Sequence, residues 1–138
     1  MTFVVVFLVD SNVIIDVLTD DPVWSDWSRK ALRAAGDDGE LAINPIIYAE
    51  IASGFATATE LDGQVEASLF RRLPLSYEAG FVAGWAFVEY RRRGGTRTSP
   101  LPDFYIGAHA AVAGLTLLTR DSRRYRGYFP KLRLLAPD

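Results

Sequence analysis

The most apolar stretch of the chain lies near its N-terminus, where the seven residues of Phe3–Val9 include no polar side chain. The run is rich in β-branched and aromatic residues, and it is too short for a buried helix of ordinary length. A continuous apolar run of this kind is typical of a strand that is buried on both faces of a parallel sheet. We therefore expect a central strand that ends at Asp10.

The rest of the chain alternates between helical periodicity and short apolar runs. Helices are predicted at Val13–Leu18, Pro22–Ala35, Ile46–Ala56, Leu61–Arg72, Tyr77–Arg93 and Pro102–Ala113. Further strands are predicted at Leu41–Ile43, Leu115–Thr119 and Leu132–Leu135, with Leu73–Leu75 as a candidate edge strand and Gly36–Gly39 as a turn. Helical crossovers between short strands imply a parallel sheet with helices on both faces. The fold class is therefore α/β, a three-layer α/β/α sandwich around a short, mainly parallel sheet.

The composition is that of an ordinary globular protein. The chain has 138 residues, of which 49% are hydrophobic and 23% charged, and this length suits a single domain spanning residues 1–138. No apolar run approaches the length of a membrane span, and the N-terminus lacks the basic residues of a signal peptide. We therefore expect a cytoplasmic protein that makes no membrane contact.

The residue types limit the metal chemistry that the chain can support. It has no cysteine and a single histidine, His109, which excludes thiolate and histidine-rich metal sites. His109 belongs to an alanine-rich helix, where a structural role is more common than a catalytic one. Any bound metal must be held by oxygen atoms, which favours Mg²⁺ or Mn²⁺.

Charge is unevenly distributed along the chain. Residues 1–70 carry 12 acidic and 3 basic side chains, whereas residues 71–138 carry 5 acidic and 12 basic side chains. A basic half can provide a surface for nucleic acid, although the two halves can also intermix in the fold so that their charges cancel. The basic candidates for RNA contacts beside Asp121 are Arg120, Arg123, Arg124 and Arg126, with Tyr125 available to stack on bases. Arg91–Arg93 with Arg97 can also contact phosphates, although a solvated helix end is the commoner explanation for three arginines at that position.

Four acidic residues occupy positions at which a parallel sheet would gather them. Asp10 and Asp121 each follow a predicted strand, so both would emerge at the same edge of the sheet. Asp103 begins a helix, where negative charge is favoured, and Glu50 is the only acid in an otherwise small and apolar stretch. Each acid also has a purely structural interpretation, as a helix cap, a turn residue or a solvated position.

If the four carboxylates converge, their mutual repulsion must be relieved. Two carboxylates about 4 Å apart repel by roughly 4 kcal/mol at an effective dielectric constant of about 20, so a cluster binds either protons or cations. One or two Mg²⁺ or Mn²⁺ ions would suit it, and paired ions can activate water for attack on a phosphodiester. Ser11, Asn12 and Thr119 lie beside these acids and can orient carboxylates or water.

An ordered set of motifs gives the chain a likeness to a known family. The motifs are Leu8–Asn12, Glu50, Pro102–Ala110, Leu118–Asp121 and the ending Tyr128–Pro130 before the last predicted strand. Together they resemble the PIN-domain ribonucleases, and most closely the VapC-type toxins of bacterial toxin–antitoxin pairs. The resemblance covers nearly the whole chain and implies a single PIN-like domain.

The resemblance also implies a function, a site and partners. It implies an endoribonuclease that hydrolyses RNA, often tRNA, and leaves a 5′-phosphate and a 3′-hydroxyl. Asp10, Glu50, Asp103 and Asp121 would be catalytic and would bind Mg²⁺ or Mn²⁺, with Asn12 or Ser11 and Thr119 supporting them. Toxins of this family are commonly homodimers, and a small antitoxin protein covers their acidic crevice.

Three alternatives remain open at the level of sequence. Trp24 and Trp27 lie on an apolar stripe that fits either core packing or a groove for the antitoxin. A phosphatase of the haloacid-dehalogenase type also places an aspartate after its first strand, but its chemistry requires a second aspartate where this chain has Asn12. The last alternative is an inactive PIN-like scaffold that binds protein or RNA, although the presence of all four acids favours an enzyme.

Overall fold

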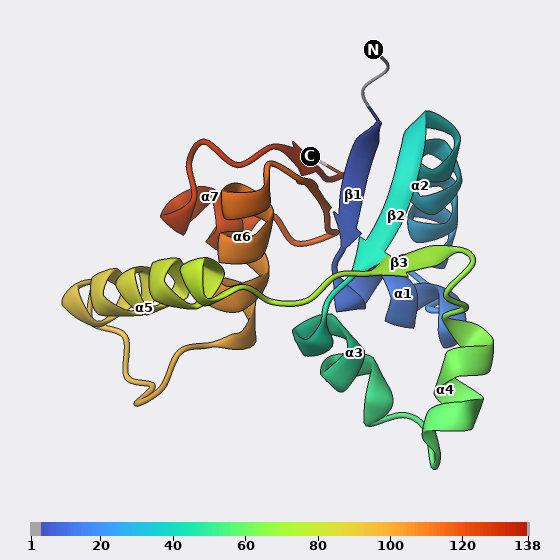
Figure 1. Ribbon diagram of the computed structural model, residues 1–138, viewed down its shortest axis with the longest axis horizontal. Helices are drawn as coiled ribbons and strands as arrows, with labels where there is room; N and C mark the ends of the chain where they lie inside the picture. Colours follow the sequence, from blue (N-terminus) through green and yellow to red (C-terminus); the bar gives the residue numbers. More distant parts are fainter. Residues whose placement is uncertain (1–3, 138) are drawn as a thin grey trace.

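A parallel sheet of five strands forms the centre of residues 4–137, the part of the chain that the computed structural model describes (Figure 1). The strands lie in the order β3-β2-β1-β4-β5, and every adjacent pair is parallel. Their bounds are β1 Val5–Val9, β2 Gly39–Ile43, β3 Phe70–Arg72, β4 Thr116–Leu118 and β5 Leu134–Leu135. The predicted α/β class and parallel sheet are thus confirmed, whereas Phe3, the expected start of the first strand, lies outside the described residues.

The described residues form seven helices. They are α1 Ser11–Leu18, α2 Ser25–Asp38, α3 Pro45–Ala52, α4 Ala58–Gln64, α5 Tyr77–Arg92, α6 Pro102–Ala113 and α7 Arg123–Tyr128. Figure 1 shows α1 and α2 on one side of the sheet and α5, α6 and α7 on the other. The arrangement is the α/β/α sandwich that the sequence predicts.

The apolar run near the N-terminus becomes the central strand β1. Leu8 and Val9 are fully buried, because β2 and β4 pair with the two edges of the strand and helices cover its faces. The strand order reverses at β1, since the chain passes first to β2 and β3 and then returns to β4 on the other side. In open α/β sheets, ligands bind beyond the carboxyl ends of the strands at such a reversal. Asp10, which follows Val9, therefore lies where a ligand site is expected.

The helix predicted at Leu61–Arg72 is wrong. The structure has the shorter helix α4, which ends at Gln64, followed by the edge strand β3. Phe70 of β3 pairs with Leu41 of β2, and a partner so distant in sequence leaves no signal in local periodicity. The edge strand expected at Leu73–Leu75 consequently occurs earlier in the chain.

Other helices also differ from the prediction. Helix α7 was not predicted, and α2 begins at Ser25 and not at Pro22. Helix α2 continues through most of the expected turn at Gly36–Gly39, so that β2 follows it directly. Helix α3 ends at Ala52 and not at Ala56, and the chain leaves it in a tight turn in which the Gly54 amide donates to the Ile51 carbonyl. None of these changes moves the acidic residues relative to the strands.

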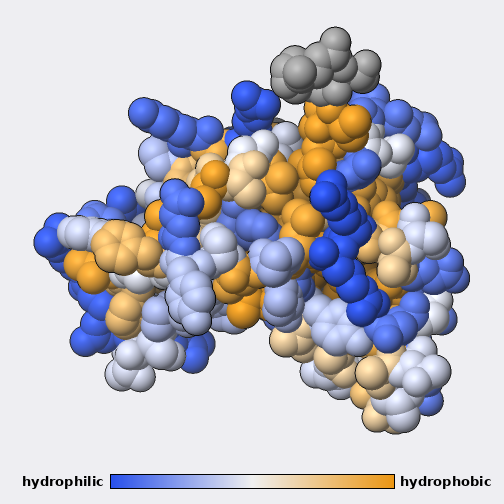
Figure 2. All heavy atoms as spheres, viewed as in Figure 1, coloured by the Kyte–Doolittle hydropathy of each residue, from blue (hydrophilic) through white to orange (hydrophobic). Residues whose placement is uncertain are grey.

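Helix α5 carries an apolar stripe on its exposed face. Tyr77, Phe81, Trp85 and Val88, here called the α5 stripe, are all exposed and recur every three or four positions. Figure 2 shows pale and orange side chains along this helix, with blue ones among them. No helix among residues 4–137 is both long and apolar enough to cross a membrane.

Candidate active site

Asp10 lies at the carboxyl end of the central strand, with only 3% of its surface exposed. Its amide donates to the Leu118 carbonyl of β4 at 2.8 Å, which extends the contact between the two strands to this residue. Its side chain caps α1, because Oδ1 accepts a hydrogen bond of 2.8 Å from the Ser11 amide. The neighbouring strand and the helix cap together fix the position of the carboxylate.

The second oxygen of Asp10 faces polar side chains from the end of β4 and from α1. Thr119, which is fully buried, donates from Oγ1 to Asp10 Oδ2 at 2.9 Å. Nδ2 of Asn12 lies 3.2 Å from Thr119 Oγ1 and 3.5 Å from Asp10 Oδ2. Parallel pairing produces these contacts, because Val9 and Leu118 are in register and the residues that follow them lie side by side. Both Asn12 and Thr119 thus contact Asp10.

Glu50 reaches the site from α3, which begins at the carboxyl end of β2. Asn44 caps this helix through its side chain and lies 3.0 Å from Nδ1 of His109 on α6. This contact agrees with the structural role expected for the buried histidine. Oε1 of Glu50 accepts a hydrogen bond of 3.0 Å from Oγ of Ser11. Ser11 therefore connects Asp10 to Glu50.

Asp103 lies in the first turn of α6, and Tyr125 of α7 connects it to Asp10. The Tyr125 hydroxyl donates to Asp10 Oδ2 at 2.8 Å and lies 3.4 Å from Asp103 Oδ1. Tyr125 is 2% exposed, so the expectation that its ring stacks on RNA bases is wrong. Its contact with the carboxylates was not predicted, because nothing in the basic, aromatic run around it distinguishes a buried tyrosine from a surface one.

Burial and mutual repulsion raise the pKa values of three of the acids. Burial is the main cause for Asp10, whose pKa rises from 3.8 to about 6, and the negative charges of Asp103 and Glu50 raise it further. Burial also raises the pKa of Glu50, with a contribution from Asp103, and the pKa of Asp103, with a contribution from Asp121. The pKa of Tyr125 rises well above its ordinary value, so its hydroxyl stays protonated as a donor. The four acids therefore interact electrostatically.

Asp121 lies at the outer end of this group and is exposed. Its amide donates to Thr119 Oγ1 at 3.1 Å, so the same hydroxyl contacts two segments of the site. Asp121 also borders two cavities, of about 370 and 630 Å³. Asp103 lines the larger one as well. The cluster is thus open to solvent on the side of Asp121.

The chemistry of the candidate ligands fits a hard divalent cation. The four acids, Asp10, Glu50, Asp103 and Asp121, offer only carboxylate oxygens, which Mg²⁺ and Mn²⁺ prefer. No cation is among the causes that shift the pKa values of Asp10 and Glu50, whereas Arg124 partly compensates the charge of Asp103. Within the described part of the chain, no three Asp, Glu or His side chains already have the spacing of ligands to one ion. In proteins Mg²⁺ usually keeps several of its waters, so one or two of these carboxylates would be enough to hold it.

Arg120, an RNA-binding candidate from the sequence, is half-buried and pairs with a buried carboxylate. Its Nε donates to Oδ2 of Asp16 at 2.8 Å, and its guanidinium lies 5.6 Å from the centre of the Trp24 ring. Asp16 is 1% exposed and also accepts a hydrogen bond of 2.9 Å from Ser28 Oγ. Arg120 therefore connects the end of β4 to α1, and its charge is partly neutralised.

The other three arginine candidates, Arg123, Arg124 and Arg126, are exposed on α7. Arg123 and Arg124 line the 630 Å³ cavity together with Asp103 and Asp121. These two therefore lie next to the acidic cluster, and the assignment of all three to RNA binding stays a prediction.

Trp24 and Trp27 contact each other edge to face, with ring centres 6.3 Å apart. Trp27 packs against the hydrophobic core, whereas Trp24 lines the 370 Å³ cavity beside Asp121. Trp24 is thus the member of the pair that a partner could contact.

Comparisons with known proteins agree with this fold and site. The model of the PIN domain family matches residues 7–130, and the chain therefore belongs to the PIN domain family. This membership confirms the resemblance found in the motifs. A comparison with curated proteins finds no match.

Solved structures of VapBC toxin–antitoxin complexes contain chains with the same fold. VapBC2 from Rickettsia felis, bound to a DNA fragment from its promoter, matches with a TM-score of 0.73 and 20% identity over 96% of this chain and 99% of that chain. VapBC-1 from nontypeable Haemophilus influenzae matches with a TM-score of 0.71 and 16% identity over 95% and 97%. DNA-bound VapBC from Salmonella typhimurium matches with a TM-score of 0.68 and 22% identity over 96% and 98%. At these identities the likeness is one of fold.

Proposed function

We propose that this protein is a Mg²⁺- or Mn²⁺-dependent endoribonuclease and the toxin of a VapBC-type toxin–antitoxin pair. The observation that carries the proposal is the buried carboxylate of Asp10 at the end of β1, which Ser11 connects to Glu50 and Tyr125 connects to Asp103. Membership of the PIN domain family and the fold of the VapBC complexes support it. The proposed substrate is RNA, tRNA included, and the proposed reaction is hydrolysis of its phosphodiester bonds.

Asp10, Glu50, Asp103 and Asp121 would hold the cation through their carboxylate oxygens. When bound, Mg²⁺ or Mn²⁺ supplies an activated water and neutralises negative charge that develops on the scissile phosphate. Oδ2 of Asp10 already accepts short hydrogen bonds from Thr119 and Tyr125, whereas Oδ1 accepts one from a backbone amide. Oδ1 of Asp10 would therefore have more capacity than Oδ2 to hold the cation.

The uncharged residues around the acids orient them. Ser11 holds Glu50 through its hydroxyl and Asp10 through its amide. Thr119 contacts Asp10 and the backbone of Asp121 through one hydroxyl group. These contacts fix the carboxylates before substrate binds, which lowers the cost of organising the site.

A cleavage assay tests the proposed activity. The wild-type protein should fragment total RNA in Mg²⁺, and a chelator should stop the reaction. Asp10→Asn should abolish cleavage, whereas Asp26→Asn, which removes an exposed acid from α2, should leave it intact. Equal cleavage by Asp10→Asn and wild type would contradict the proposal. No cleavage of any RNA by folded, metal-loaded wild type would favour the inactive scaffold.

We also assign the antitoxin to the side of the site that Trp24 borders. The cavity of about 370 Å³ there is lined by Trp24, Arg120 and Asp121, so a bound peptide would lie against the acidic cluster and block it. Co-purification with a small partner protein tests this assignment. Trp24→Ser should weaken the complex, while Trp85→Ser, on the exposed face of α5, should not.

The α5 stripe is the surface we assign to a homodimer. Phe81 and Trp85 are 68% and 59% exposed and contact each other with ring centres 6.3 Å apart. Contiguous exposed apolar side chains of this kind commonly mark protein interfaces. Light scattering should therefore report a dimer for wild type and a monomer for a Phe81→Ser and Trp85→Ser double variant. A dimer that survives both substitutions would place the interface elsewhere.

A further inference from the structure

A cavity of about 630 Å³ adjoins the acidic cluster, and arginines from two helices border it. Asp103 and Asp121 lie on its acidic side, while Arg123 and Arg124 of α7 and Arg93 at the end of α5 line the rest. Its volume falls within the range of about 300–1,000 Å³ that is usual for ligand sites. The cavity therefore combines an edge of carboxylates with a wall of arginines.

Arg93 is fixed at this wall by contacts with its own helix and with α7. Its Nε donates to Oε1 of Glu89 at 3.0 Å, and its Nη1 donates to the Gly127 carbonyl at 3.1 Å. Its guanidinium also lies 4.5 Å from the centre of the Tyr128 ring. The side chain nevertheless remains 49% exposed. A cation held in this way loses little further rotamer freedom when an anion binds.

Arg124 lies between the cationic and acidic sides of the cavity. Its Nη1 is 3.5 Å from Oδ2 of Asp103, and the two side chains are 42% and 37% exposed. An ion pair of this length and exposure contributes little stability. A phosphate can therefore replace Asp103 as the partner of Arg124 at small cost.

Arg120 occupies the other side of Asp121. It lines the smaller cavity and pairs with the buried carboxylate of Asp16. The basic run that looks uniform in sequence is therefore divided by the fold, since Arg120 pairs with Asp16 while Arg123 and Arg124 border the larger cavity. Arg93, which is remote in sequence, joins them there. Arg123 lies between the two cavities and lines the smaller one as well.

We infer that the 630 Å³ cavity is the subsite for the RNA backbone phosphate next to the scissile one, with Arg93, Arg123 and Arg124 as its ligands. The inference rests on the proposed nuclease function and names the substrate-binding residues of that site. Guanidinium groups bind phosphate oxygens through paired N–H donors. The carboxylate side repels a phosphate unless cations are bound, so the scissile phosphate belongs beside Asp103 and Asp121 and its neighbour belongs among the arginines.

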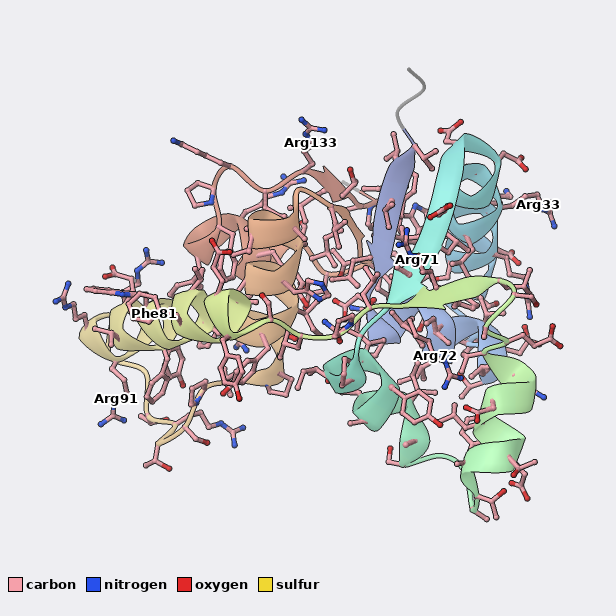
Figure 3. The ribbon with its side chains drawn as sticks, viewed as in Figure 1. Arg33, Arg71, Arg72, Phe81, Arg91 and Arg133 are labelled. Atoms are coloured by element: carbon pink, nitrogen blue, oxygen red, sulfur yellow. The ribbon has the colours of Figure 1, made fainter. Side chains whose placement is uncertain are left out.

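The test measures RNA binding separately from cleavage. A fluorescein-labelled single-stranded oligouridylate is titrated with protein that carries Asp10→Asn, in Mg²⁺ and at several salt concentrations. Arg93→Ala, Arg123→Ala and Arg124→Ala should each weaken binding and reduce the slope of log K against log salt by about 0.7, the value for one lost contact to a single strand. Arg33→Ala, which removes the same charge from α2 on the opposite side of the molecule (Figure 3), should change neither quantity.

Three outcomes would overturn the inference. They are unchanged slopes in the three cavity variants, an equal loss of slope in Arg33→Ala, and the absence of any RNA binding. Loss of antitoxin binding with unchanged RNA binding would also overturn it, because the cavity would then hold a protein. Thermal melting checks that each variant folds, and Arg93→Gln replaces Arg93→Ala if the latter does not.

Different experimental results would refute this inference and the proposed nuclease function. Wild-type protein that cleaves RNA, with unchanged slopes in the cavity variants, refutes the subsite and leaves the nuclease. Protein that binds RNA through these arginines without cleaving it under any metal condition refutes the nuclease and leaves the binding subsite.

Discussion

The hydroxyl of Tyr125 donates a hydrogen bond of 2.8 Å to Oδ2 of Asp10, although 115 positions separate the two residues in the chain. The same hydroxyl lies 3.4 Å from Oδ1 of Asp103. A neutral donor from α7 is therefore placed between two carboxylates that repel each other. It stabilises the ionised form of Asp10 without neutralising the charge that a cation would require.

Replacing this tyrosine should affect stability in a pH-dependent way. In Tyr125→Phe, the ionised carboxylate of Asp10 loses a charge-assisted hydrogen bond, which costs about 1–3 kcal/mol in a buried position. Because this bond lowers the pKa of Asp10, its loss should raise that pKa further. The decrease in unfolding free energy should thus be larger at pH 8 than at pH 4. Denaturant titrations at both pH values check this.

Tyr105→Phe is the matched control for that experiment. Tyr105 is half-buried on α6, and removing its hydroxyl should produce a small change that is the same at both pH values. A Tyr125→Phe effect that did not vary with pH would mean that the hydroxyl contributes only packing.

The raised pKa of Asp10 predicts how stability depends on pH. Its pKa is about 6 in the folded protein and 3.8 in an unfolded chain, so the folded state holds the proton more tightly. The metal-free protein therefore loses stability as the pH rises from about 4 through 6, by about 3 kcal/mol in total. Asp10→Asn removes this dependence. The unfolding free energy of the variant relative to wild type should increase by that amount between pH 4 and pH 7, and a constant difference would contradict the assignment.

Divalent cations should stabilise the folded protein. Binding to the folded state alone raises the unfolding free energy by about 2.7 kcal/mol at a ligand concentration of 100 times Kd. Thermal melting in Mg²⁺ or Mn²⁺ should therefore shift upward at pH 7.5, and a chelator should reverse the shift. The shift should shrink below pH 6, because protons then compete for Asp10. Asp10→Asn and Asp103→Asn should both reduce it, and an undiminished shift in these variants would place the cation elsewhere.

The Arg120–Asp16 pair should contribute to stability more than to RNA binding. Arg120→Ala leaves the carboxylate of Asp16, which is 1% exposed, with its hydrogen bond from Ser28 but without its cationic partner. Losing one partner of a fully buried pair costs several kcal/mol, and since Arg120 is 32% exposed we expect about 2 kcal/mol. Denaturant unfolding measures the loss. The double variant Asp16→Asn and Arg120→Ala should recover part of it, which a purely additive effect would not allow.

Two helical glycines should respond in opposite ways to a methyl group. A Cβ at Gly107 of α6 would lie 2.5 Å from Cε2 of Phe129, a nearly buried ring. Gly107→Ala should therefore overpack this contact and cost about 1–3 kcal/mol. At Gly80 of α5 no atom lies within 4 Å of the added Cβ, so Gly80→Ala should stabilise by about 0.5–1 kcal/mol through helix propensity. Thermal melting of both variants tests the α6–α7 packing that holds Tyr125 in place.

Those features of the fold that follow from local pattern could be predicted from the sequence. The apolar run that ends at Asp10 indicated the central strand, since a strand buried on both faces needs such a run. The alternation of strands and helices indicated the parallel sheet, because consecutive parallel strands need a crossover connection, which is usually a helix. The edge strand β3 could not be predicted, because its stability comes from pairing with β2 and not from its own residues.

The sequence by itself determined which residue types stand at the ends of the strands, and hence that oxygen ligands could gather at one edge of a parallel sheet. Tertiary structure alone decided that Tyr125 lies between Asp10 and Asp103 and that Arg120 turns inward to Asp16. It also brought Arg93 to the cavity wall beside α7. The physical reason is that strand and helix periodicity act over a few residues. Contacts between distant side chains instead depend on how α5, α6 and α7 pack against one another, which no local pattern records.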